Sequence, residues 1–228
     1  RRPRPRATAW RAGAPSPTWG CSPGVETNAM FGGAVDNNLS VSLGVARTGR
    51  LDGVALALGG NWASHPVRGI QLAIGGNVAR EDVTGAQFSV GGNLATGAVG
   101  GMQATVGLNI ARQGGLAGQL AVGGNFSGAP LDGAQLSVGS NWVHGDFGGY
   151  QGTVGVNMVQ GRMAGVQMSV GMNWAASAQG VQLSLLNVGA TSRAYSWASS
   201  TSRIRSTACS SASSTWRRSL SPACRWAC

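Results

Sequence analysis

Apolar and polar residues alternate along the chain in a pattern that returns at a fixed interval. One clear copy is the segment 134–142, Ala-Gln-Leu-Ser-Val-Gly-Ser-Asn-Trp, in which apolar side chains alternate with polar or small ones. An alternation with a period of two is typical of a β-strand, because successive side chains point to opposite faces. The asparagine of this segment recurs with a period of 16, without a slip, at Asn61, Asn77, Asn93, Asn109, Asn125, Asn141, Asn157 and Asn173.

Positions are counted from this asparagine, so that position −3 lies three residues before it. Large apolar residues recur at positions −5, −3 and +1, which fall on one face of an extended chain. This pattern predicts that the apolar face packs into a core, with Trp62, Trp142 and Trp174 among the core residues. A further apolar residue at position +6, such as Val67 or Phe147, predicts a second short strand or a corner that also faces a core.

The opposite face carries glutamine at position −6, a small residue at −4, glycine at −2 and the asparagine itself. Stacked copies align identical side chains, so we expect the asparagines to form a structural ladder of hydrogen-bonded amides. The glutamines predict a polar ladder that faces a repetitive ligand such as a glycan, a cell-wall polymer or ice. The simpler interpretation is that these amides satisfy one another. The ladder comprises Gln71, Gln87, Gln103, Gln119, Gln135, Gln151 and Gln167.

A repeat this short cannot bury its own apolar face, so neighbouring copies must stack. The favoured prediction is an all-β fold of tandem 16-residue repeats, a β-solenoid in which each repeat makes one coil. Two alternatives are an up-and-down β-barrel with one strand per repeat and a shallow ring of short hairpins. In the solenoid, the glycine at position −2 serves a corner or a tight approach of two backbones.

Charge divides the chain into three segments. The net charge of +10 comes from the two ends, because residues 31–190 carry six arginines and six acidic residues. We therefore expect a foreign or disordered segment at 1–30, the repeat domain at 31–190, and a tail at 191–228. A GC-rich coding string for one repeat, read one base late, translates into the tail residues 194–201, which predicts a frame-shifted, disordered segment. All four cysteines lie in the two ends.

The repeat domain shows no catalytic constellation. His65 and His144 lie in turns five repeats apart, and the carboxylates never recur in phase. The glycine-rich phrases lack the lysine that a phosphate-binding loop requires. The sequence thus predicts a protein that is not an enzyme, with no catalytic or metal site and no cofactor. Nucleic acid is not an expected partner, because the arginine-rich ends lie outside the repeats.

The phrase Gly180-Val181-Gln182-Leu183-Ser184-Leu185-Leu186-Asn187-Val188 resembles bacterial surface-repeat proteins built from tandem G-x-Q-x-G-x-x-N units. The resemblance covers about residues 38–190, although the units of this chain keep their own period of 16. It implies export to the cell surface or outer membrane, with a structural or adhesive role. No signal peptide is visible in this sequence. Alternatives are a pore-like outer-membrane barrel and a solenoid that binds a surface polymer through the glutamine ladder.

Overall fold

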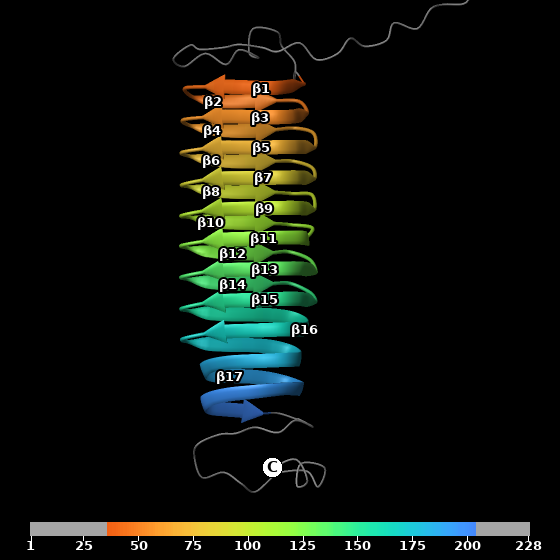
Figure 1. Ribbon diagram of the computed structural model, residues 1–228, viewed down its shortest axis with the longest axis vertical. Helices are drawn as coiled ribbons and strands as arrows, with labels where there is room; N and C mark the ends of the chain where they lie inside the picture. Colours follow the sequence, from red (N-terminus) through yellow and green to blue (C-terminus); the bar gives the residue numbers. More distant parts are fainter. Residues whose placement is uncertain (1–35, 204–228) are drawn as a thin grey trace, which may run out of the picture.

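The chain forms a column of stacked coils that follow one another in sequence order (Figure 1). The computed structural model describes residues 36–203. Each coil has one long strand and one short strand, and the two run in opposite directions on opposite sides of the column. Every regular element of the described residues is a β-strand, which confirms the predicted all-β repeat fold. No helix long and apolar enough to cross a membrane occurs within 36–203.

The strands differ in length because each repeat has two unequal extended segments. The long strands are β1 (Asn37–Ser42), β3 (Leu51–Ala57), β5 (Val67–Ala73), β7 (Val83–Ser89), β9 (Val99–Thr105), β11 (Gly115–Ala121), β13 (Leu131–Ser137) and β15 (Phe147–Thr153). The short strands are β2 (Val45–Thr48), β4 (Gly60–Ala63), β6 (Gly76–Ala79), β8 (Gly92–Ala95), β10 (Leu108–Ala111), β12 (Gly124–Ser127) and β14 (Ser140–Val143). The last coils are continuous strands, β16 (Val156–Ser169) and β17 (Met172–Arg203).

Each strand pairs in parallel with the equivalent strand of the next coil. The register places identical residues side by side, as with Asn109 and Asn125 or Gln103 and Gln119. The solenoid is therefore the correct architecture. The barrel and the ring of hairpins are wrong for this chain, because both need antiparallel pairs between successive strands.

Glycines at two positions allow the coils to stack this closely. A Cβ atom on Gly75, at position −2, would lie 2.0 Å from the carbonyl oxygen of Gly59 in the preceding coil. The predicted role of this glycine in a tight backbone approach is thus confirmed. Gly85, at position −8, has a φ of +140°, and a Cβ there would lie 2.0 Å from the oxygen of Gly69. Both sites exclude any larger residue without a shift of the backbone.

The inside and outside of the coil are reversed relative to the sequence prediction. The interior holds the asparagines, the glutamines and the residues at positions +2 and +6, including Val67 and Phe147. The apolar residues at −5, −3 and +1 point outward, and Trp62 and Trp142 are 37% and 39% exposed. The predicted core role of these tryptophans is therefore wrong, whereas the core role of position +6 is confirmed.

The coils shorten towards the end of the described region. Gln182 pairs with Gln167 after 15 residues, and Asn187 pairs with Asn173 after 14. Strand β17 continues to Arg203, beyond the limit of the repeat domain predicted at residue 190. Residues 1–30 and most of the predicted frame-shifted tail, 204–228, lie outside the described residues. The frame shift stays a prediction, which resequencing of the gene would test.

Candidate functional site

The asparagine ladder runs along the inward face of the short strands. Asn109 is typical: its Nδ2 atom donates to Oδ1 of Asn125 at 2.9 Å, and also to the backbone oxygens of Gln103 at 3.1 Å and Leu120 at 2.8 Å. The same three bonds recur from Asn61 to Asn173 with equivalent partners. Each asparagine therefore ties its own coil to the next one, which confirms the predicted structural ladder.

The glutamine ladder lies on the inward face of the long strands, and its hydrogen bonds point in the opposite direction along the stack. Nε2 of Gln119 donates to Oε1 of Gln103 at 2.7 Å, and Nε2 of Gln135 donates to Oε1 of Gln119 at 2.7 Å. The asparagines donate towards the C-terminal end of the stack, whereas the glutamines donate towards the N-terminal end. A buried amide costs little free energy when its hydrogen bonds are made, so these two ladders can share the interior with the apolar residues at positions +2 and +6.

Both ladders end at the N-terminal side of the stack. Ala46 is the residue paired with Asn61, and Ala55 is the residue paired with Gln71. Alanine has no side-chain amide. Within the described residues, Oδ1 of Asn61 and Nε2 of Gln71 are therefore buried without a hydrogen-bond partner. These two atoms mark where the repeated pattern begins.

The glutamines do not face a ligand. Each is at most 2% exposed, and its amide is engaged by the neighbouring coils. The predicted ligand-facing ladder is therefore wrong, and the interpretation of mutually satisfied amides is correct. The physical reason is the 16-residue register, which places every glutamine within hydrogen-bond distance of the next. The glutamines buried in this way are Gln71, Gln87, Gln103, Gln119, Gln135, Gln151 and Gln167.

In the coils from Asn61 to Asn173, the outward surface of the short strands carries one apolar residue per coil at position +1. We call this the outer row, and its aromatic members lie in three parts of the stack. The ring centroids of Phe126 and Trp142 lie 6.3 Å apart in neighbouring coils with a tilt of 52°. The guanidinium of Arg80 lies over the ring of Trp62, 5.2 Å from its centroid. The outer row comprises Trp62, Val78, Leu94, Ile110, Phe126, Trp142, Met158 and Trp174.

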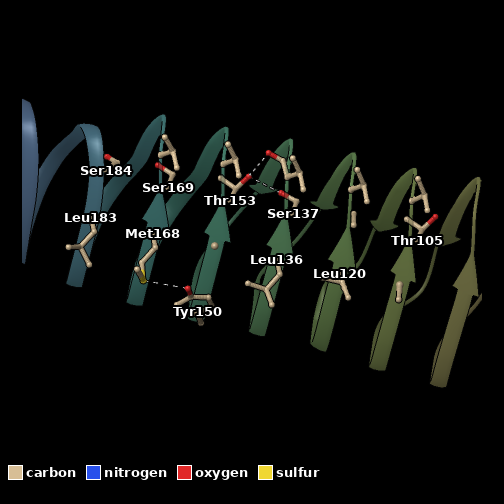
Figure 2. Close-up of a pocket in the computed structure, with 18 of the residues that line it drawn as sticks. Thr105, Leu120, Leu136, Ser137, Tyr150, Thr153, Met168, Ser169, Leu183 and Ser184 are labelled. Atoms are coloured by element: carbon tan, nitrogen blue, oxygen red, sulfur yellow. Dashed lines mark hydrogen bonds between the residues drawn. The ribbon is translucent and has the colours of Figure 1, made fainter.

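A second apolar surface lies where each long strand turns into the short strand. We call it the apolar edge, and it comprises positions −5, −4 and −3 of every coil. Figure 2 shows Leu120, Leu136 and Met168 in one line along the coils, with Thr105, Ser137, Thr153 and Ser169 in a parallel line. The residues at −3, such as Val138, are about half exposed. Sequence reasoning missed this surface, because it assigned the apolar residues to the core.

The opposite turn of each coil, at positions +3 to +5, carries the charged and polar side chains, and we call it the charged edge. His65 Nδ1 lies 3.3 Å from Oε1 of Glu81 in the next coil, with both side chains about half exposed. Asp82 accepts a hydrogen bond from the backbone nitrogen of Ala98 at 2.8 Å, and Asp146 accepts one from Arg162 in the same way. These aspartates therefore link successive turns.

The charged edge brings no catalytic set together. Within residues 36–203, no three His, Cys, Asp or Glu side chains lie close enough to hold a metal ion. The predictions of no enzymatic activity and no cofactor stay predictions. The two repeated apolar surfaces are thus the best candidates for contact with another molecule.

Comparisons of the chain with protein-family models, with curated proteins and with solved structures gave no match. The chain is a tandem-repeat protein on the evidence of its own stacked coils.

Proposed function

We propose that this is a non-enzymatic protein with a structural or adhesive role at a bacterial cell surface, to which it is exported. One observation carries the proposal. The amides that could bind a polar ligand are occupied inside the stack, while large apolar side chains repeat outward on every coil. A stack held by two continuous ladders is a regular scaffold that presents the same contact many times. The resemblance to surface-repeat proteins supports the location.

The location is tested on intact cells that produce the protein from its complete gene. Antibody labelling of unbroken cells, together with fractionation, should place the protein at the surface or with the outer membrane. Labelling that appears only after the cells are broken, with the protein in the cytoplasmic fraction, would overturn the proposed location.

The adhesive role is tested by adsorption of the purified chain to methyl-terminated and hydroxyl-terminated surfaces in a microbalance. We expect stronger retention on the methyl surface, because burial of apolar area provides the driving force. A variant with Trp62, Trp142 and Trp174 replaced by Thr should lose much of this preference. Arg112→Ala, on the charged edge, is the control. Equal retention of both variants would contradict the role of the outer row.

A second candidate function is binding of a regular surface polymer through the outer row. The paired rings of Phe126 and Trp142 favour this candidate, because exposed aromatic faces stack on the apolar faces of sugar rings. In this candidate the polymer binds to the exposed outer row and not to the buried glutamine ladder. In pull-downs with insoluble peptidoglycan, Phe126→Ala combined with Trp142→Ala should weaken binding about tenfold. Unchanged binding would exclude the outer row as the polymer site.

A further inference from the structure

The apolar edge forms a continuous groove along the stack. Its floor is the row of small residues at position −4, which are buried or half-buried, and its walls are the more exposed rows at −5 and −3. One section, of about 890 Å³, runs from Phe88 to Ser184, and a second, of about 520 Å³, runs from Val41 to Val90. The two sections share Phe88 and Ser89, so the groove extends from Val41 in β1 to Ser184 in the first part of β17.

The hydroxyl groups of the floor are engaged with the protein. Ser137 donates to Oγ1 of Thr153 at 3.0 Å, and Thr153 donates to the backbone oxygen of Gly139 at 3.1 Å. Thr105 likewise donates to the oxygen of Val90 at 3.2 Å. Oγ of Ser169 is the one buried floor hydroxyl without a partner in the described residues. The groove therefore offers a molecule outside the chain mainly shape and apolar contact.

Charge is absent from this side of the molecule. Positions −5 to −2 carry no acidic or basic residue in any coil of the described region. The charged side chains lie mainly on the opposite, charged edge and on the neighbouring outward positions of the strands. An anionic membrane surface would favour arginine or lysine beside the apolar stripe, as interfacial segments show. The apolar edge thus lacks the feature that a lipid surface would use.

The size of the apolar edge matches a stable protein interface. The residues at position −3 are 52–59% exposed in every coil from Leu58 to Val170, and those at −5 are exposed in most coils. Together they present on the order of 1,000 Å² of contiguous apolar surface, more than the few hundred Å² usual on a monomer. A standard interface buries about 800 Å² on each partner. The area is therefore sufficient for one lateral contact.

We infer that the apolar edge pairs with the apolar edge of a second copy of this chain. Each copy carries a ridge, the −3 row, directly beside a groove, the −4 row. A two-fold axis parallel to the stack places the ridge of each copy in the groove of the other. A second copy has the same spacing of about 4.8 Å per coil, so ridge and groove stay in register along their whole length. Antiparallel copies would instead meet ridge on ridge.

The first test is the mass of the full chain in solution, measured by sedimentation equilibrium over micromolar concentrations. We expect twice the 23.0 kDa of one chain. Val122→Lys combined with Val138→Lys places charges on the ridge and should raise the dissociation constant at least 100-fold. Leu116→Lys lies in the same coil as Val122 but outside the apolar edge, and it should sediment as a dimer.

Three outcomes would overturn the inference. These are a single-chain mass for the unmodified protein at all concentrations, equal dissociation of both lysine variants, and a monomer that floats with phosphatidylcholine–phosphatidylglycerol vesicles. Circular dichroism checks the fold of each variant. If the lysine pair does not fold, Val122→Thr with Val138→Thr should weaken the dimer without a buried charge. None of these measurements depends on adhesion or polymer binding, so they test pairing separately from the proposed function.

The orientation of the pair is tested by disulfide formation in a chain whose four native cysteines are replaced by serine. Val170→Cys lies near one end of the stack, so only parallel copies bring it close to its own counterpart. Oxidation should give a covalent dimer with Val170→Cys and none with Leu116→Cys. A dimer that Val170→Cys fails to link would overturn the parallel arrangement.

Discussion

The inside and the outside of the coil follow opposite rules. Inside, uncharged amides such as those of Asn109 and Gln119 are almost fully buried, while outside, residues as apolar as Trp142 and Val138 contact solvent. The amides are accepted inside because every coil supplies a partner for the next, at 2.7–2.9 Å along most of each ladder. Burial of these amides thus depends on repetition, because a single coil would have no neighbouring amide with which to form these hydrogen bonds.

The largest expected effect comes from a charge placed inside. Gln119→Lys would break two ladder bonds and bury an ammonium group beside Gln103 and Gln135. We expect the free energy of unfolding to fall by about 4 kcal/mol or more. Chemical denaturation measures the loss, and Leu116→Lys, with the same charge on the outside, is the control. Similar stability of the two variants would mean that the glutamines are accessible after all.

Removal of one asparagine amide should have the next largest effect. Asn109→Leu leaves the carbonyl oxygen of Leu120 and Oδ1 of Asn125 without their donor. Because the unpaired groups stay buried, we expect a loss of about 3 kcal/mol in the free energy of unfolding. Urea denaturation with Asn109→Asp as a second variant tests the role of the donor: the carboxylate cannot donate, so it should not restore stability.

Completion of the glutamine ladder at its open end should stabilise the protein. Ala55→Gln would place an Oε1 atom near the unpartnered Nε2 of Gln71, and Ser40 lies opposite position 55 in the preceding coil. We expect a gain of about 1 kcal/mol, the usual net value of one hydrogen bond. Thermal denaturation should show a higher midpoint, whereas Ala55→Leu, which adds volume without an amide, should not raise it.

The smallest effect is expected for an outward apolar residue. Leu116 is 71% exposed on the outside of β11, away from the apolar edge. Leu116→Thr removes no buried contact, and threonine suits a strand, so stability should change by less than about 0.5 kcal/mol. A denaturant titration measures the change, and a loss as large as that of a buried residue would show that another part of the chain covers this surface.

The sequence was sufficient to predict the repeat, its period and its strands. The spacing of Asn61 to Asn173 predicted coils with identical residues in register, and the structure pairs those residues. The core role of position +6 and the close backbone approach at the glycine of position −2 were also predicted correctly. Each of these features depends on local geometry, because a 16-residue period and a two-residue alternation are visible in the letters alone.

The alternation of apolar and polar residues alone could not show which face of the strand is buried. One feature of the sequence indicated the correct face. Positions +2 and +6, as at Ala63 and Val67, are separated from the asparagine by an even number of residues and so lie on the same face of the chain. The general tendency of apolar residues to lie inside favoured the other face. That tendency failed here because the cost of burying an amide depends on its partners, which the stack supplies.

The sequence by itself thus determined a stack of 16-residue β-coils with aligned asparagines and glutamines. Only the tertiary structure decided that these amides lie in the interior and that the outer row and the apolar edge lie outside. The physical reason is that hydrogen bonding between coils is a property of the assembled stack: an amide is acceptable inside only when the next coil is already in place. Of the two apolar surfaces left outside, the apolar edge is the one that the second copy would cover.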